Sequence, residues 1–118
     1  MGLLIEAQGS CHCQAVRFSI KSTVEERTTC NCSLCRRRAT QMIKVHESEF
    51  VLLSGKEQLK EYQFHTQTAT HHFCAVCGIY PFHRKRVTPD YYGINVNCLE
   101  DADLSALPLR ETHGADMD

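Results

Sequence analysis

The chain has no tryptophan, few prolines and glycines, and almost no net charge. Its 118 residues include three Pro and six Gly, only 8% are aromatic, and the formal net charge is −1. Proteins that bind nucleic acid usually combine a basic surface with aromatic or basic side chains that contact bases and phosphates. We therefore expect neither nucleic acid nor an anionic membrane surface as a partner.

Long apolar segments are missing as well. The longest apolar runs, such as residues 50–53, span only a few residues, whereas about 20 are needed to cross a membrane. Residues 1–6 contain no basic stretch followed by a long apolar run, so the sequence predicts no signal peptide. We expect a cytoplasmic protein, in a reducing compartment where disulfides are rare.

Cysteine, by contrast, is abundant and clustered. Seven of the eight cysteines fall into three short stretches, at residues 11–13, 30–35 and 74–77. In a reducing compartment such clusters are metal or redox sites more often than disulfides. Zinc prefers sulfur and nitrogen ligands in a tetrahedron, and thiolates two or three residues apart can converge on one ion. Seven thiolates would fill one closed site of four and one site of three with an open position.

Two of the stretches each supply a pair of thiols. Cys74-x-x-Cys77 followed by Gly78 is a zinc-knuckle pattern, and the glycine permits the positive φ angle that such a turn often needs. The same spacing occurs in thioredoxin-like redox sites, but their βαβ context is missing here. Cys11-x-Cys13 is a weaker pattern by itself. A metal bound by both pairs would tie the N-terminal strand to the later sheet.

The third stretch, Cys30-x-Cys32-x-x-Cys35, places three thiols on one short loop. We expect this loop to bind a metal ion and to leave one coordination position open. Two alternatives are a fourth protein ligand that closes the site and redox chemistry without metal. The candidates for a fourth ligand are Cys98, His46, His71, His72 and His83. For Cys98 we prefer a place in the core, since free cysteine is among the most buried residue types.

Short strand-like segments separated by turn residues make up most of the chain. Alternating or β-branched patterns predict strands at residues 15–20, 41–46, 50–55, 59–64, 69–73, 79–84 and 91–99. Pro81 has no backbone N–H, which favours an edge strand or a bulge at that point. Helices are weakly indicated at 33–39 and 100–107. The length predicts one domain, residues 1–105, and a loosely held tail at 106–118.

The three clusters, in this order and spacing, resemble the glutathione-dependent formaldehyde-activating enzyme family, which also includes the centromere protein V domain. The matching stretches are residues 9–13 with 16–18, 30–37, 73–78 and 95–101. The resemblance implies a mainly β fold of the β-tent type, in which zinc holds antiparallel sheets together. It places a structural zinc on Cys11, Cys13, Cys74 and Cys77, and a catalytic zinc on Cys30, Cys32 and Cys35. The chain departs from the family pattern at two places: Gln14 stands where glycine is usual, and Ala39 and Thr40 stand where a glycine is common.

The family's activity joins glutathione and formaldehyde into S-hydroxymethylglutathione, so the resemblance implies a carbon–sulfur lyase-type enzyme acting on a small thiol and a small aldehyde. An open zinc position suits capture of the thiol, with polarisation of the aldehyde as the alternative. Arginine binds carboxylates through two parallel hydrogen bonds, and glutathione has two carboxylates. Candidate contacts are Arg36, Arg37 and Arg84, with Arg38 and Arg86 also considered; a solvated face is the alternative for each. The competing hypothesis is a non-enzymatic zinc scaffold, and a related thiol-adduct reaction would use the same site.

Overall fold

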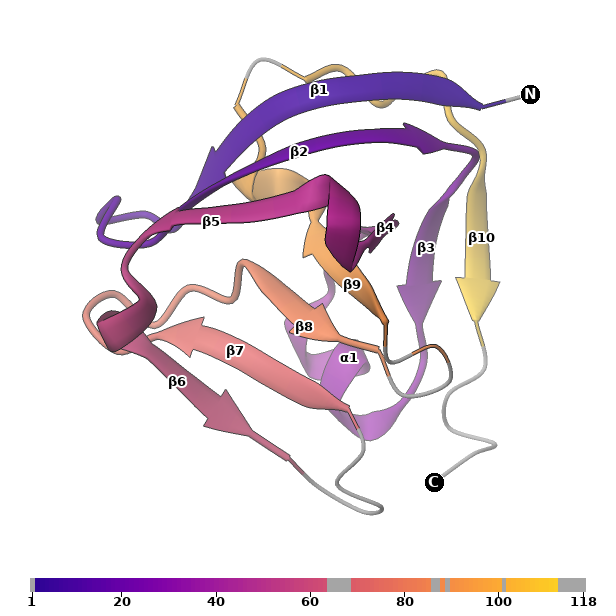
Figure 1. Ribbon diagram of the computed structural model, residues 1–118. Helices are drawn as coiled ribbons and strands as arrows, with labels where there is room; N and C mark the ends of the chain where they lie inside the picture. The colour runs from indigo at the N-terminus through magenta and orange to yellow at the C-terminus, as the bar shows by residue number, and fades with distance from the viewer. Residues whose placement is uncertain (1, 64–68, 86–87, 89, 101, 113–118) are drawn as a thin grey trace.

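Two β-sheets pack against each other around a shared core (Figure 1). The computed structural model describes residues 2–63, 69–85, 88, 90–100 and 102–112. The smaller sheet is antiparallel and has the strand order β1-β2-β5. Its strands are β1 (Leu3–Ser10), β2 (Arg17–Val24) and β5 (Phe50–Ser54).

Within the described residues, the larger sheet has seven strands in the order β10-β3-β4-β9-β8-β7-β6. They are β10 (Leu109–Thr112), β3 (Arg27–Cys30), β4 (Met42–His46), β9 (Tyr91–Asn95), β8 (Phe82–Arg84), β7 (Thr70–Cys74) and β6 (Leu59–Tyr62). Neighbouring strands are antiparallel except β10 and β3, which run parallel. The expected mainly β fold is confirmed.

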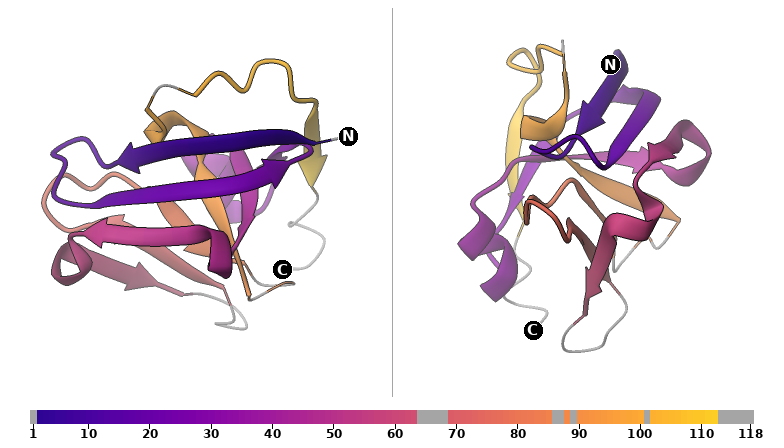
Figure 2. Two further views of the ribbon diagram at one scale, coloured as in Figure 1. Left: turned by 45° about the horizontal axis from the view of Figure 1, so that its top comes forward. Right: turned by 90° about the vertical axis from the view of Figure 1, so that its left-hand side faces the viewer.

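Helical segments are short and lie between strands. Helix α1 (Ser33–Arg38) connects β3 to β4, two neighbouring strands of the larger sheet. Figure 2 shows the arrangement from two further directions. Short 3-10 helices occupy Glu47–Glu49, Lys56–Gln58 and Val96–Cys98. In the part of the chain that is described, no helix has both the length and the apolar character that crossing a bilayer requires.

The side chains of β2 show why the two sheets pack together. Phe18, Ile20 and Val24 are buried, whereas Lys21 and Thr23 between them are exposed, as expected for a strand with one buried face. The Phe18 ring lies 5.5 Å from that of Phe50 and 5.8 Å from that of Phe82 in the second sheet. Burying one such side chain stabilises the fold by about 1.5–3 kcal/mol.

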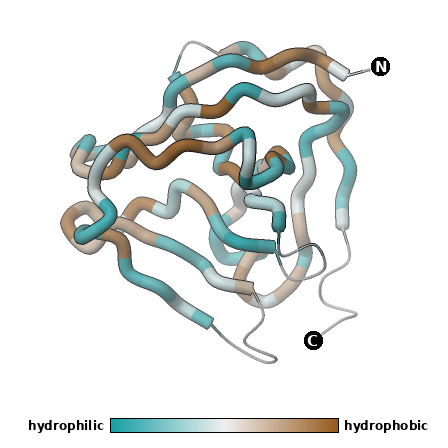
Figure 3. Tube along the Cα trace, viewed as in Figure 1, coloured by the Kyte–Doolittle hydropathy of each residue, from teal (hydrophilic) through white to brown (hydrophobic). Residues whose placement is uncertain are grey.

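Hydrophobic residues are concentrated on the strands that form this core. Most of β5 is hydrophobic, as its brown colour in Figure 3 shows, and its half-buried Phe50 and Leu52 pack against the core. From the second sheet, the fully buried members include Ile43 and Val45 on β4, Ile94 on β9 and Cys74 on β7. The core therefore joins the sheet whose strand β1 ends just before Cys11 to the sheet that contains Cys30 and Cys74.

Several expected elements are confirmed, but the expected position of the strand at Pro81 is wrong. Strands lie within or across the seven predicted segments, and the helix predicted at 33–39 is α1; residue 64 lies outside the described residues. The edge position expected at Pro81 is wrong, because β8 lies between β7 and β9. The strand begins at Phe82, so the missing N–H of Pro81 falls outside the ladder, and the Pro81 carbonyl accepts a 2.9 Å hydrogen bond from the Asn95 N–H.

The C-terminal part of the chain differs from the prediction in two ways. The described residues from Glu100 to Leu107 form turns rather than a helix, since the Asp103 carboxylate accepts from the Ser105 N–H and hydroxyl at 3.0 and 2.7 Å. The loose tail expected from residue 106 is wrong up to residue 112. Leu107 is buried, β10 pairs with β3, and Arg110 forms an ion pair with Glu26 at 2.6 Å. Residues 113–118 lie outside the described residues.

Candidate metal centres

Four cysteines from opposite parts of the chain form the first cluster, called here the four-cysteine cluster. Cys11 and Cys13 follow β1, and Cys74 and Cys77 lie at the end of β7 and in the turn after it. The four sulfur atoms all lie within 4.8 Å of one another. Cys13 Sγ lies 3.6 Å from Cys11 Sγ and 3.7 Å from Cys74 Sγ. Four sulfurs at about 2.3 Å from a tetrahedral zinc would lie about 3.8 Å apart, so the cluster fits this ion.

Two tight turns hold these thiols in place. In the first turn, the Gln14 N–H donates to the Cys11 carbonyl at 3.2 Å and the Val16 N–H donates to Cys11 Sγ at 3.4 Å. In the second, the Gly78 N–H donates to the Cys74 carbonyl at 2.8 Å, with Gly78 at φ 80°. The positive φ expected for Gly78 is confirmed. Cys11 and Cys74 are almost fully buried, at 2% and 0% exposure, so this cluster is part of the contact between the two sheets.

The second cluster, called here the three-cysteine cluster, lies where β3 leads into α1. Cys30 ends β3, Cys32 is the N-cap of α1, and Cys35 lies in its first turn. Their sulfur atoms also lie within 4.8 Å of one another. The Cys35 N–H donates to Cys32 Sγ at 3.3 Å, which is the bond that an N-cap side chain usually accepts. One helix start thus brings the three thiols to the same side.

Among the described residues, no further His, Cys, Asp or Glu atom joins the three-cysteine cluster. Cys98 is buried with its Sγ 3.9 Å from the Tyr80 carbonyl, and burial raises its pKa to about 11. Its expected place in the core is confirmed. His46 caps the 3-10 helix at Glu47–Glu49, and the ring of His72 lies 5.0 Å from that of Phe82. His71 and His83 lie together in the core beside Tyr80.

Electrostatics also point to a cation at the three-cysteine cluster. Burial raises the pKa of the Cys35 thiol, and the neighbouring Cys32 and Cys30 act in the same direction. The Cys35 thiol resists ionisation because it is partly buried and because a charge there would be repelled by charge on the neighbouring thiols. A bound cation reverses this balance, since metal ions bind the deprotonated thiolate. The donor set of both clusters is therefore suited to a soft divalent metal.

The candidate arginines fall into two groups. Arg36 and Arg37 are exposed on α1, close in sequence to the three-cysteine cluster, and Arg37 Nη1 donates to the Ser33 carbonyl at 2.7 Å. Arg84 forms an ion pair with Glu47 at 2.6 Å and donates to the Tyr92 hydroxyl at 2.8 Å. Arg38 is half-buried and contacts Tyr80 and His71, and Arg86 lies outside the described residues.

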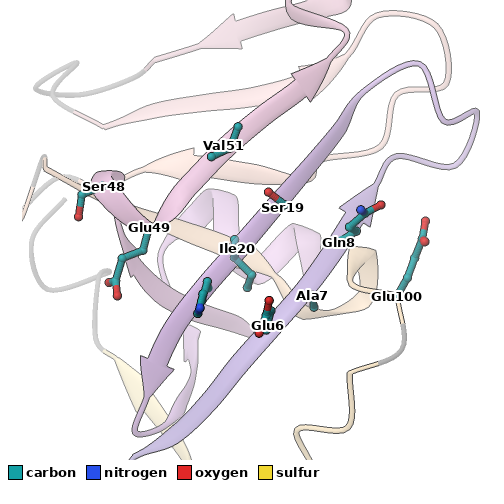
Figure 4. Close-up of a pocket in the computed structure, with 10 residues that line it drawn as sticks. Glu6, Ala7, Gln8, Ser19, Ile20, Ser48, Glu49, Val51 and Glu100 are labelled. Atoms are coloured by element: carbon teal, nitrogen blue, oxygen red, sulfur yellow. The ribbon is translucent and has the colours of Figure 1, made fainter.

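A separate hollow of about 630 Å³ lies on the smaller sheet and contains none of the clustered cysteines. Figure 4 shows that its lining comes from β1, β2, β5 and the 3-10 helix Glu47–Glu49 before β5, with Glu6, Glu49 and Glu100 around it. Carboxylates and no cysteines line this hollow, so we assign it no part in the thiol chemistry of the two clusters.

Four polar residues near the three-cysteine cluster contact one another, a grouping that sequence reasoning missed: it had named Arg38, His71 and His83 for other roles and had given Tyr80 no role at all. They are Arg38, His71, Tyr80 and His83, and we call them the buried polar cluster. His71, Tyr80 and His83 are 4%, 8% and 9% exposed. The available signal was Tyr80 and His83, two polar residues at a short spacing after the second pair of cysteines in a segment otherwise predicted as a strand. Sequence could not show that this strand lies inside the sheet.

Comparison with known proteins agrees with this arrangement. The family model described as glutathione-dependent formaldehyde-activating enzyme matches residues 6–113. The chain belongs to this family. The resemblance inferred from the cysteine stretches is thereby confirmed. A crystal structure of a Rhodobacter sphaeroides protein is similar in fold, with 38% sequence identity and a TM-score of 0.78, over 86% of this chain and 98% of that one.

The two departures from the pattern of the glutathione-dependent formaldehyde-activating enzyme family share one backbone feature. Gln14 and Ala39 have φ angles of 67° and 54°, and they are the non-glycine residues with positive φ in the described part of the chain. Glycine adopts this conformation without the steric cost that a Cβ atom brings. Gln14 follows the first cysteine pair, and Ala39 ends α1 with its N–H donating to the Cys35 carbonyl at 2.9 Å. The turns beside both clusters are therefore retained without glycine.

Proposed function

We propose that this protein is a zinc-dependent carbon–sulfur lyase-type enzyme that forms and breaks the adduct of glutathione with formaldehyde, S-hydroxymethylglutathione. A related small thiol and aldehyde would use the same site. The observation that carries this proposal is the three-cysteine cluster, in which three sulfurs converge without a further ligand from the described residues. Family membership supports glutathione and formaldehyde as the substrate class.

The two clusters would have different roles. The four-cysteine cluster has the four thiols that a closed zinc site needs and lies between the sheets, so we assign it to the fold. Cys30, Cys32 and Cys35 would hold a second zinc. When bound there, zinc supplies the Lewis acidity that lowers the pKa of an incoming thiol to give a thiolate near neutral pH.

Protein side chains would bind and orient the thiol substrate. Arg36 and Arg37 are exposed on α1, one and two residues after Cys35, and are suited to the carboxylates of glutathione. Arg84 would have to exchange its 2.6 Å ion pair with Glu47 to take part. We therefore expect Arg36 and Arg37 to contribute more to glutathione binding than Arg84. The cytoplasm, where glutathione is abundant and thiols stay reduced, is the compartment that this chemistry needs.

The test compares the zinc-loaded wild type with Cys35→Ser and Cys98→Ser, with metal content measured for each. The wild type should bind two zinc ions and accelerate the exchange between formaldehyde, glutathione and their adduct, followed by NMR. Cys35→Ser should bind one zinc ion and lose the acceleration while keeping its fold by circular dichroism. Cys98→Ser is the control and should keep both metals and the activity.

Two outcomes would contradict the proposal. One is a wild type with two zinc ions that exchanges the adduct no faster than buffer. The other is a second zinc that glutathione neither contacts nor displaces, which would favour a scaffold in which both metals are structural.

A further inference from the structure

The buried polar cluster connects the strand after the second cysteine pair with the helix of the three-cysteine cluster. The Arg38 guanidinium carbon lies 3.5 Å from the centre of the Tyr80 ring, and Arg38 Nη1 donates to His71 Nδ1 at 3.1 Å. The Tyr80 hydroxyl is hydrogen-bonded to His83 Nδ1. The rings of His71 and His83 stack with their centres 5.2 Å apart. The four side chains therefore form one continuous contact.

The backbone around these residues is shaped to hold them. Asn95 Nδ2 donates to the Tyr80 carbonyl at 2.9 Å, which fixes the chain just before β8. A Cβ atom on Gly93 would come within 2.3 Å of His83 Cε1, so only glycine leaves room for this ring. Burying polar groups costs free energy unless they are hydrogen-bonded. A set of polar side chains held this closely in a core of small size suggests a role in the chemistry.

Tyr80 also lies near the three-cysteine cluster through its contact with Arg38. Cys35 and Arg38 are three residues apart on α1, a spacing that places two side chains on the same face about 5–6 Å apart. Arg38 in turn covers the Tyr80 ring. Burial raises the pKa of Tyr80; Arg38 opposes the shift, while charge on Cys35 and Cys32 adds to it. The hydroxyl thus stays protonated within electrostatic reach of the three-cysteine cluster.

The condensation is accelerated by a hydrogen-bond donor at the aldehyde oxygen. The thiol gives up its proton to water, the sulfur lone pair forms the C–S bond, and the carbonyl π pair moves to oxygen. That oxygen then takes a proton from water, so the sum is one thiol and one aldehyde giving one hydroxymethyl thioether. A neutral donor aimed at the developing alkoxide stabilises the transition state and keeps its own proton.

We propose that the Tyr80 hydroxyl is this donor, and that His83, His71 and Arg38 are positioning residues for it. The proposal rests on the proposed function, since it concerns a catalytic residue of the same reaction. In this arrangement neutral His83 carries its proton on Nδ1 and donates to the Tyr80 oxygen, which leaves the phenolic proton for the substrate. Burial lowers the pKa of His83 well below its usual range, in keeping with a neutral ring.

The decisive variant is Tyr80→Phe, with Tyr62→Phe on β6, whose ring is about half exposed, as the matched control. Tyr80→Phe should lower kcat for adduct exchange about 10²-fold, with zinc content and the glutathione Kd from calorimetry unchanged. Tyr62→Phe should match the wild type. If Tyr80→Phe keeps the wild-type kcat in an active enzyme, the inference is wrong and the proposed function stands. If the wild type itself is inactive, both are wrong.

Two further measurements keep the inference testable if Tyr80→Phe does not fold. His83→Gln should lower kcat about tenfold, because it removes the hydrogen bond that orients the Tyr80 hydroxyl. The KM for glutathione should stay unchanged, because His83 does not take part in thiol binding. An unchanged kcat, or a loss confined to KM, would overturn the inference. Nitrogen-15 chemical shifts of His83 in the wild type should show the proton on Nδ1, and a proton on Nε2 instead would also contradict it.

Discussion

The two cysteine clusters gather the same kind of atom, the thiol sulfur, in opposite structural settings. In the four-cysteine cluster, Cys13 and Cys74 are 61 residues apart in sequence, and their sulfurs lie 3.7 Å apart. In the three-cysteine cluster, all three thiols fall within one strand end and the first turn of α1. A metal in the first cluster closes a large loop of chain and joins two sheets, whereas a metal in the second closes a loop of six residues. Loss of the first should therefore affect folding, and loss of the second should affect chemistry.

The largest expected effect is the contrast between Cys74→Ser and Cys32→Ser. Cys74→Ser removes a fully buried ligand of the four-cysteine cluster and should lower the free energy of unfolding by on the order of several kcal/mol, since a structural zinc contributes directly to folding. Cys32→Ser should remove the second zinc but change stability by about 1 kcal/mol or less, because serine is itself a good N-cap for α1. Thermal unfolding with zinc analysis measures both.

Equal destabilisation by the two substitutions would break the comparison, since it would mean that both clusters support the fold. A matched control is Cys98→Ser, which changes a core cysteine outside either cluster. The change in the free energy of unfolding of Cys98→Ser shows what a cysteine-to-serine substitution in the core costs when neither cluster loses a thiol.

A smaller effect is expected at the two non-glycine residues with positive φ. Gln14→Gly and Ala39→Gly should each raise the free energy of unfolding by about 0.5–1 kcal/mol, because relief of the left-handed backbone outweighs the extra freedom of glycine in the unfolded chain. Denaturant unfolding of the zinc-loaded protein measures this gain. Gln14→Gly acts at the turn of the four-cysteine cluster and Ala39→Gly at the end of α1, so only Ala39→Gly should alter adduct exchange.

The control for this pair is Ala7→Gly in the middle of β1, where the backbone has ordinary φ and glycine should destabilise. A loss of stability in either positive-φ variant, as large as that of Ala7→Gly, would contradict the argument from backbone conformation.

The smallest expected effect concerns the strand beside the three-cysteine cluster. Arg110 on β10 holds the pKa of Glu26 below its usual value, through a hydrogen bond and its charge. A carboxylate whose pKa is lower in the folded state stabilises the fold above its unfolded pKa, and this contribution is lost as pH falls through the folded pKa. Glu26→Gln should therefore lower the melting temperature slightly at pH 7, and the difference from the wild type should vanish in acid.

Thermal unfolding measured from pH 7 down to about pH 3 tests this sign. A destabilisation by Glu26→Gln that grows as the pH falls would contradict the role of the ion pair. Because Thr112 on β10 pairs with Cys30 on β3, metal content measured alongside would show how far this strand supports the three-cysteine cluster.

Much of the fold could be predicted from local patterns, with clear exceptions. The alternation in β2 and the β-branched run of β4 indicated buried strand faces, and both strands are found. Strand β3 has only four residues, all half-buried, so it carries no alternation that a sequence reading can use. Strand β10 is stabilised by parallel pairing with β3 rather than by its own residues, which are mostly exposed. Long-range pairing of this kind has no local signal.

The sequence by itself determined which thiols are available and how each group is spaced along the chain. Spacing acts through local backbone geometry, so it predicted the Gly78 turn and three thiols gathered on one short stretch of chain, whereas the structure showed that this stretch runs from the end of β3 into the start of α1. Only the tertiary structure decided that the pair at Cys11 meets the pair at Cys74, and that Tyr80 and His83 lie against Arg38 near the second cluster. Those contacts depend on strand order and on sheet packing, which arise from interactions between residues far apart in sequence.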